Sequence, residues 1–84
     1  MAKAKVYRNV MREVGATPEI HVTDLPLASE WLTSYRYRGR FGWVMIGANN
    51  HSEALREASR SISERVTTDK LEVWNGDRYQ PVEA

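Results

Sequence analysis

The pattern of apolar residues at the start of the chain favours a helix. Apolar side chains recur at helical spacing within residues 3–14, at Val6, Tyr7, Val10, Met11 and Val14. Gly15 follows them and suits the end of a helix. A strand is the alternative, because valine and tyrosine are also frequent in strands.

The next stretch predicts a short strand followed by a short helix. Residues 19–23 alternate between polar and apolar side chains and include β-branched residues. Asp24 then has the side chain of a helix N-cap, and Pro26 is tolerated in the first turn of a helix. We therefore expect a helix over residues 25–34 that buries Trp31 and Leu32 in the core.

A β-hairpin is predicted over residues 35–48, where strand-like stretches 35–38 and 41–48 flank Gly39. A two-residue loop of Gly39 and Arg40 is one possible register. In this register the first-strand arginines share a face with the second-strand rings, and the first-strand tyrosines cover the core. That arrangement creates an exposed surface that is both basic and aromatic.

A three-residue loop is the other register. It pairs Tyr37 with Phe41 and Tyr35 with Trp43, so the rings gather on one face and the arginines on the other. The rings would then belong mostly to the core. The small size of the domain favours this second register, because a small core needs its large side chains.

A helix that follows the polar cap residues 49–52 and runs to about Val66 is expected after the hairpin. Asn50 and Glu53 have nearly the spacing of a capping box. Arg60 and Glu64 are four residues apart, which suits an ion pair along the helix. Its apolar face consists of Leu55, Ala58, Ile62 and Val66.

The end of the chain predicts a second hairpin. Residues 71–74 and 78–82 flank the turn sequence Asn75-Gly76-Asp77, and Pro81 suits a strand at the edge of a sheet. The whole order predicts an α+β fold, a small single domain over residues 1–84. We expect an antiparallel β-sheet of about four to five strands, including two hairpins, with two to three helices packed mainly on one face.

The composition excludes several classes of protein. The 84 residues include no cysteine, which rules out disulfide bonds, thiolate metal sites and cysteine nucleophiles. No apolar run approaches the roughly 20 residues of a membrane span, and the first residues lack the apolar stretch of a signal peptide. We therefore expect a cytoplasmic protein without a membrane partner.

The charges are distributed unevenly although the net charge is only +1. Residues 1–52 contain seven basic residues (lysine or arginine) and four acidic ones. Residues 53–84 contain five basic residues and seven acidic ones. No acid occurs between Glu30 and Glu53. The arginines of the first hairpin therefore have no carboxylate near them in the sequence. Two interpretations are open: they bind an anionic partner, or they solvate an exposed face.

Residues 35–43 contain four aromatic rings and three guanidinium groups, and they are the main candidate site. Such a stretch can stack on planar groups and neutralise anions at the same place. We expect a non-enzymatic binding module, with DNA or RNA as its first candidate partner. The candidate binding residues are Tyr35, Arg36, Tyr37, Arg38, Arg40, Phe41 and Trp43.

A protein partner is the alternative. The chain would then be a small interaction, inhibitor or accessory protein of the kind that phages and plasmids encode, as a monomer or a homodimer. Trp74, Arg78 and Tyr79 form a candidate secondary interface, because tryptophan, tyrosine and arginine are common anchors of protein contacts.

The sequence supports no catalytic or cofactor site. His21 and His51 lack the spacing of metal ligands, so we expect no metal. The glycines do not form a phosphate-binding or dinucleotide motif, and the serines of residues 59–63 have no histidine base at an informative spacing. We therefore expect neither an enzyme nor a cofactor.

Residues 35–62, a basic hairpin followed by a helix with Leu55-Arg56-Glu57-Ala58, resemble the arm-type DNA-binding domain of tyrosine recombinases. The resemblance implies DNA binding by a three-stranded sheet backed by a helix. It covers about a third of the chain, contains no diagnostic motif and ends upstream, where residues 25–34 are predicted to be helical. It is too limited for a family assignment.

Overall fold

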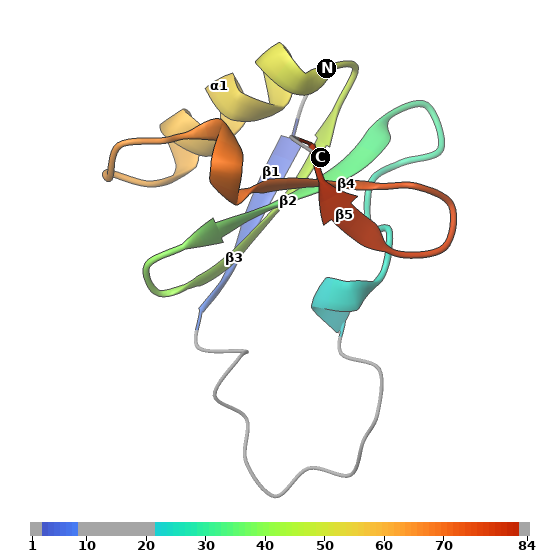
Figure 1. Ribbon diagram of the computed structural model, residues 1–84, viewed down its shortest axis with the longest axis horizontal. Coiled ribbons are helices and arrows are strands. Elements are labelled where there is room, and N and C mark those ends of the chain that lie inside the picture. The colour runs from blue at the N-terminus through green and yellow to red at the C-terminus, as the bar shows by residue number, and fades with distance from the viewer. Residues whose placement is uncertain (1–2, 9–21, 83–84) are drawn as a thin grey trace, which may run out of the picture.

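The computed structural model describes residues 3–8 and 22–82, whose strands form one antiparallel sheet in the order β1-β3-β2-β4-β5 (Figure 1). The strands are β1 (Lys3–Arg8), β2 (Thr33–Gly39), β3 (Gly42–Ala48), β4 (Leu71–Trp74) and β5 (Tyr79–Pro81). The α-helix is α1 (His51–Ser61), and two short 3-10 helices are η2 (Val22–Asp24) and η3 (Thr68–Lys70).

The predicted α+β fold with two to three helices is wrong, because the described residues contain a single α-helix and are nearly all-β. Residues 3–8 form strand β1, which pairs with β3 and places Val6 opposite Val44. Lys3 and Lys5 are exposed, whereas Ala4 and Val6 pack against the core, so this stretch follows the two-residue period of a strand. The rest of the predicted helix, residues 9–14, lies outside the described residues.

The predicted strand over residues 19–23 is also wrong where it can be checked. Val22 and Thr23 belong to the 3-10 helix η2, and residues 19–21 lie outside the described residues. The N–H of Leu25 donates to the carbonyl oxygen of Val22 at 3.2 Å, which closes this turn.

The predicted helix over residues 25–34 does not form. Side chains from the sheet bind the backbone of this segment: Tyr79 donates its hydroxyl to the carbonyl oxygen of Leu25 at 2.8 Å, and Ser34 Oγ accepts the N–H of Ala28 at 3.1 Å. These bonds replace the ones that a helix would make along its own backbone. Trp31 consequently points away from the core and is 83% exposed, contrary to its predicted burial.

The hairpin of β2 and β3 adopts neither of the two predicted registers. Gly39 pairs with Gly42, so the loop consists of Arg40 and Phe41. Gly42 has a φ of 147°, a backbone conformation that favours glycine. This loop is shifted by one residue from the predicted loop of Gly39 and Arg40, so Arg38 pairs with Trp43 and not with Phe41, two residues further along the second strand than predicted. Because side chains alternate with a period of two, the faces are those of that first register.

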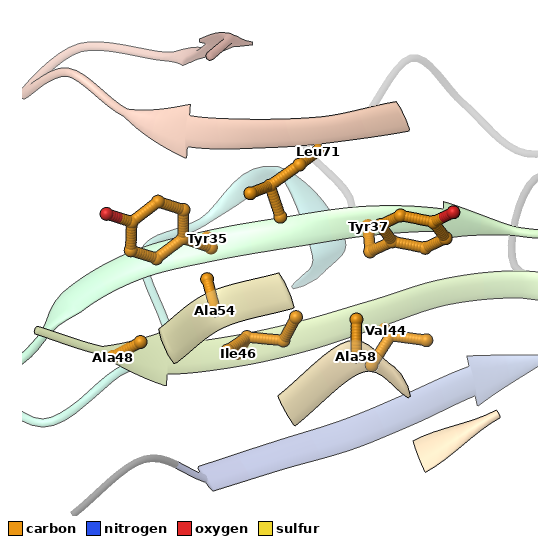
Figure 2. Close-up of a cluster of buried hydrophobic side chains, with 8 residues drawn as sticks. All are labelled: Tyr35, Tyr37, Val44, Ile46, Ala48, Ala54, Ala58 and Leu71. Carbon is orange, nitrogen blue, oxygen red and sulfur yellow. The ribbon is translucent and has the colours of Figure 1, made fainter. Parts of the chain in front are cut away.

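One face of the sheet forms the core under α1 (Figure 2). The rings of Tyr35 and Tyr37 lie along β2 next to the side chains of β3, and Leu71 of β4 approaches them from the other side. Small residues on the helix allow it to lie close to the sheet. The buried residues are Tyr35, Tyr37, Val44, Ile46, Ala48, Ala54, Ala58 and Leu71.

The start of α1 confirms the prediction from Asn50, while its end differs. Asn50 Oδ1 accepts the N–H of Glu53 at 2.8 Å, and Glu53 Oε1 accepts the N–H of Asn49 at 3.0 Å. The helix ends at Ser61 instead of Val66 because the following residues bind the hairpin. The N–H of Thr67 donates to the hydroxyl of Tyr37 at 2.9 Å.

Segment 22–32 covers part of the other face of the sheet. A Cβ atom on Gly47 of β3 would lie 3.0 Å from Cβ of Ala28 and 3.1 Å from Cδ1 of Leu32. Only glycine leaves room for this approach. In the part of the chain that the structure describes, no helix has the length and apolar character needed to span a membrane.

Candidate functional site

Basic side chains from separate segments surround a depression of about 380 Å³ beside the tip of the β2–β3 hairpin. Arg38 comes from β2 and Arg40 from the hairpin loop, while Lys70 ends η3. Pairing of β2 with β4 brings η3 to this place, because Tyr37 lies opposite Leu71, the residue after Lys70. We call this site the basic depression; it is lined by Arg38, Gly39, Arg40, Glu64, Arg65 and Lys70.

Glu64 is the acid in the lining, and its carboxylate binds the main chain. Its Oε1 and Oε2 atoms accept the backbone N–H of Arg40 at 3.2 and 3.3 Å. The predicted ion pair between Arg60 and Glu64 is not found among the described residues, where Arg60 instead lies 3.7 Å from Glu57. Glu64 therefore fixes the hairpin tip without forming an ion pair with a guanidinium group in the described part of the chain.

Three cations of the basic depression lack an ion-pair partner within the described ranges. Among residues 3–8 and 22–82, no ion pair involves Arg38, Arg65 or Lys70. Asp69 interacts with two of these cations: a hydrogen bond from the Thr67 side chain lowers the pKa of Asp69, and the charges of Lys70 and Arg38 lower it further. Asp69 is therefore ionised at neutral pH, and the two acids only partly offset the positive charge of the lining.

An aromatic ring stands next to these charges at the hairpin tip. Phe41 is 58% exposed, and the guanidinium carbon of Arg40 lies 5.9 Å from the centre of its ring. Arg40 and Phe41 also line a second depression of about 420 Å³, on the side where Arg60 and Ser61 end the helix. The tip therefore separates two hollows and presents a ring and a guanidinium group between them.

The other predicted binding residues of the hairpin serve the fold. Tyr35 and Tyr37 are buried in the core, and the hydroxyl of Tyr35 lies 2.8 Å from Nδ1 of His51. Burial raises the pKa of Tyr35, and the charge of Glu53 adds to this effect. These two rings are buried and cannot stack on a ligand. Of the predicted binding residues, those at the tip of the hairpin therefore remain as candidates.

Arg36 also lies inside the molecule, with its side chain only 14% exposed. Its Nε donates to Glu72 at 2.7 Å, and its Nη1 donates to Asp24 at 2.9 Å and to the carbonyl oxygen of Thr23 at 3.0 Å. The guanidinium carbon lies 4.1 Å from the ring centre of Trp43 and 4.6 Å from that of Tyr79. Arg36 therefore ties η2 to the sheet and holds Trp43 in place.

The predicted secondary interface is divided between the interior and the surface. Trp74 is half-buried, and its ring contacts that of Tyr79 edge-on at 5.2 Å. Tyr79 is buried under Leu25, and burial raises the pKa of its hydroxyl to about 12. Arg78 is exposed and pairs with Asp77 at 3.2 Å. These residues are close in space, but only Arg78 is fully accessible.

Three lining residues were not predicted as site residues from the sequence: Glu64, Arg65 and Lys70. They occur in the acidic part of the chain, where a single lysine or arginine does not indicate a basic site. Their position depends on the early end of α1 and on the pairing of β4 with β2. A correct strand order would have been the only signal, because it places residue 70 beside residue 38.

No group of three or more histidine or acidic residues in the described ranges could hold a metal ion. Tyr35 and His51 place a hydroxyl beside an imidazole, as some catalytic sites do. Tyr35 is buried, and its raised pKa keeps the hydroxyl protonated at neutral pH. The pair therefore connects β2 to the start of α1.

Comparison with known proteins gives one distant similarity. No family model and no solved structure matches the chain. The chain is similar to the isochorismate synthase of Escherichia coli (strain K12), with 26% identity over 96 residues and 95% of the chain covered. The match spans 22% of the enzyme, so the chain corresponds to about a fifth of its length. The resemblance to arm-type DNA-binding domains rests on residues 35–62 alone.

Proposed function

We propose that this chain is a non-catalytic binding module that holds a single strand of nucleic acid across the tip of the β2–β3 hairpin. One observation carries the proposal: Arg38, Arg40, Arg65 and Lys70 surround one depression whose lining acid, Glu64, binds the main chain. Converging cations that form no ion pair within residues 3–8 and 22–82 suit a chain of phosphates.

The exposed ring at the tip favours an unpaired strand over a duplex. A base can stack on Phe41 only when it is free of its own neighbour in a helix, and each stacked base contributes about 1–3 kcal/mol. The phosphates on either side of that base would enter the two depressions that flank the ring. Arg60 adds a mostly exposed cation on the second side.

The similarity to isochorismate synthase does not support an isochorismate synthase activity for this chain. The chain matches only 22% of that isochorismate synthase, and an activity of the whole enzyme cannot be assigned to so small a part. The proposal therefore rests on the geometry of the hairpin tip.

Salt dependence tests the proposal directly. We expect a labelled oligonucleotide of about 12 bases to bind at low salt, with log affinity falling against log salt at a slope of about −2 to −3. This slope corresponds to about four neutralised phosphates on a single strand. Fluorescence anisotropy between about 50 and 400 mM NaCl measures it.

Paired variants locate the binding surface. Changing Arg38→Ala together with Lys70→Ala should make the slope shallower by about 1.4. The control changes Arg56→Ala with Arg78→Ala, which removes the same charge from exposed residues that do not line the depression. Absence of binding at low salt, or an equal effect of the control pair, would contradict the proposal.

A protein-binding role is the second candidate, and the exposure of Trp31 favours it. This tryptophan is 83% exposed, with Leu25 and Leu27 also exposed on the same segment. Tryptophan is a frequent anchor of protein contacts. Self-association in sedimentation experiments that Trp31→Ala abolishes, together with absent oligonucleotide binding, would favour this role over the first.

A further inference from the structure

We propose that the cleft between β1 and the segment of residues 27–32 binds a small organic acid, with its apolar part inside the cleft and its carboxylate at the rim. The cleft encloses about 320 Å³, at the lower end of the range of about 300–1,000 Å³ for small-molecule sites. It lies on the face of the sheet opposite α1 and shares no lining residue with the basic depression.

The interior of the cleft is apolar and has fixed walls. Its floor includes Met45, which is buried, and Gly47 of β3. Leu27, Ala28 and Leu32 line the opposite wall. The hydrogen bond of the Ala28 N–H with Ser34 Oγ, at 3.1 Å, holds that wall to the sheet. The apolar body of a ligand would therefore enter a preformed space.

Tyr79 fixes the segment beyond the wall. It also lines the cleft, and its hydroxyl donates to the carbonyl oxygen of Leu25 at 2.8 Å. Because this hydroxyl already has a partner, Tyr79 presents mainly its ring to a ligand. The close approach of Ala28 and Leu32 to Gly47 holds the two sides together at the β3 end of the cleft.

Positive charge is confined to the rim of the cleft. Lys3 and Lys5 alternate along β1 and therefore extend on the same side of the sheet, where both line the cleft. The ammonium of Lys5 lies 5.4 Å from the ring centre of Tyr7, which is another lining residue. None of the described residues that line the cleft is an aspartate or glutamate. The rim thus favours an anion, and the interior favours its apolar part.

Phenylacetate and phenylacetamide are matched probes, because they have nearly the same shape and differ in charge. We expect phenylacetate to shift the backbone amide resonances of residues 27–32 and 45–47 in a saturable way, with a dissociation constant below about 20 mM. Phenylacetamide should bind about five- to tenfold more weakly, which corresponds to roughly 1–1.4 kcal/mol.

Charge variants test whether the rim lysines cause the preference for phenylacetate over phenylacetamide. Lys3→Gln with Lys5→Gln should reduce the affinity for phenylacetate to that for phenylacetamide and leave phenylacetamide binding unchanged. Both lysines are exposed, so the variant keeps the fold. The control is Arg56→Gln with Arg78→Gln, which removes the same charge from exposed residues outside the described lining of the cleft. Equal affinities for the two probes, no saturable shift, or an unchanged preference in the double variant would each overturn the inference.

Discussion

Glu64 holds the backbone of Arg40, with its carboxylate oxygens 3.2 and 3.3 Å from the Arg40 nitrogen. The contact joins the segment after α1 to the tip of the β2–β3 hairpin. The carboxylate forms this contact without pairing with a guanidinium group in the described part of the chain. The geometry of the tip and its attraction for anions can therefore be changed separately.

Glu64→Gln should increase the affinity for a single-stranded oligonucleotide. The amide oxygen of glutamine can still accept the Arg40 N–H, while one negative charge leaves the depression. We expect a gain of about 0.5–1 kcal/mol, or roughly two- to fivefold in affinity, at low salt. Fluorescence anisotropy measures this change.

Glu30→Gln is the matched control for Glu64→Gln. It produces the same change in net charge at an exposed residue of the segment before β2, away from the lining of the depression. An equal gain in both variants would mean that overall charge governs the binding. A loss of affinity in Glu64→Gln would place the binding surface elsewhere.

Arg36→Met should strongly destabilise the protein. The change removes hydrogen bonds to Glu72, Asp24 and the Thr23 carbonyl, and it leaves the half-buried Glu72 carboxylate without its cation. We expect a loss of about 2–4 kcal/mol in the free energy of unfolding. Urea denaturation followed by tryptophan fluorescence measures this loss.

Arg38→Met provides the comparison for Arg36→Met. Arg38 lies two residues after Arg36 on the same face of β2, and its side chain is exposed. Its replacement should therefore change the free energy of unfolding by at most about 0.5 kcal/mol. The same change should weaken oligonucleotide binding. Equal destabilisation by the two variants would contradict the interior role of Arg36.

Arg36 and Arg38 illustrate what the sequence can and cannot predict. Both occur in a basic stretch without nearby acids, and sequence analysis treated them alike. Strand order distinguishes them, because β4 places Glu72 opposite Arg36. The information needed was a pairing between residues 36 positions apart, which local patterns do not contain.

Elements with strong local signals were predictable. The turn sequence Asn75-Gly76-Asp77 does join β4 to β5, and Asn50 does cap α1. Residues 25–34 failed because Ser34 and Tyr79 bind their backbone, which overrides a modest helical tendency. Residues 3–8 form a strand because β3 offers an edge to pair with, so tertiary contacts decided between the two structures that the sequence allowed.

Gly47→Ala should destabilise the protein by about 1–3 kcal/mol. The added methyl group would lie 3.0 Å from Cβ of Ala28 and 3.1 Å from Cδ1 of Leu32, so the covering segment must move away from the sheet. Thermal or urea denaturation measures the loss. Amide resonances of residues 28–32 should shift at the same time.

Gly76→Ala separates crowding from backbone strain. Gly76 has a φ of 103°, and an added Cβ would have no neighbouring atom within 4 Å. The substitution should lower the free energy of unfolding by about 1 kcal/mol, because alanine disfavours this backbone conformation. The amide resonances of residues 28–32 should stay unchanged. If Gly47→Ala is tolerated without loss or resonance shifts, the close packing of segment 22–32 on β3 is refuted.

Tyr79→Phe should make the protein less sensitive to alkaline pH. Burial raises the pKa of Tyr79 from 10.0 to about 12, so above pH 10 its hydroxyl ionises more readily in the unfolded chain than in the folded one. The stability linked to this group is therefore complete below pH 10 and is lost as the pH rises through about 12. Phenylalanine does not ionise, so the variant should lose less stability between these two pH values.

Near neutral pH the same variant should be weaker than the wild type. Tyr79→Phe removes the hydrogen bond to the Leu25 carbonyl, at a cost of about 0.5–1.5 kcal/mol. The curves of unfolding free energy against pH should therefore converge as the pH rises above 10. The raised pKa of Tyr35 leaves a residual decline in the variant. Parallel curves would show that Tyr79 ionises equally in both states and is not enclosed beneath segment 22–32.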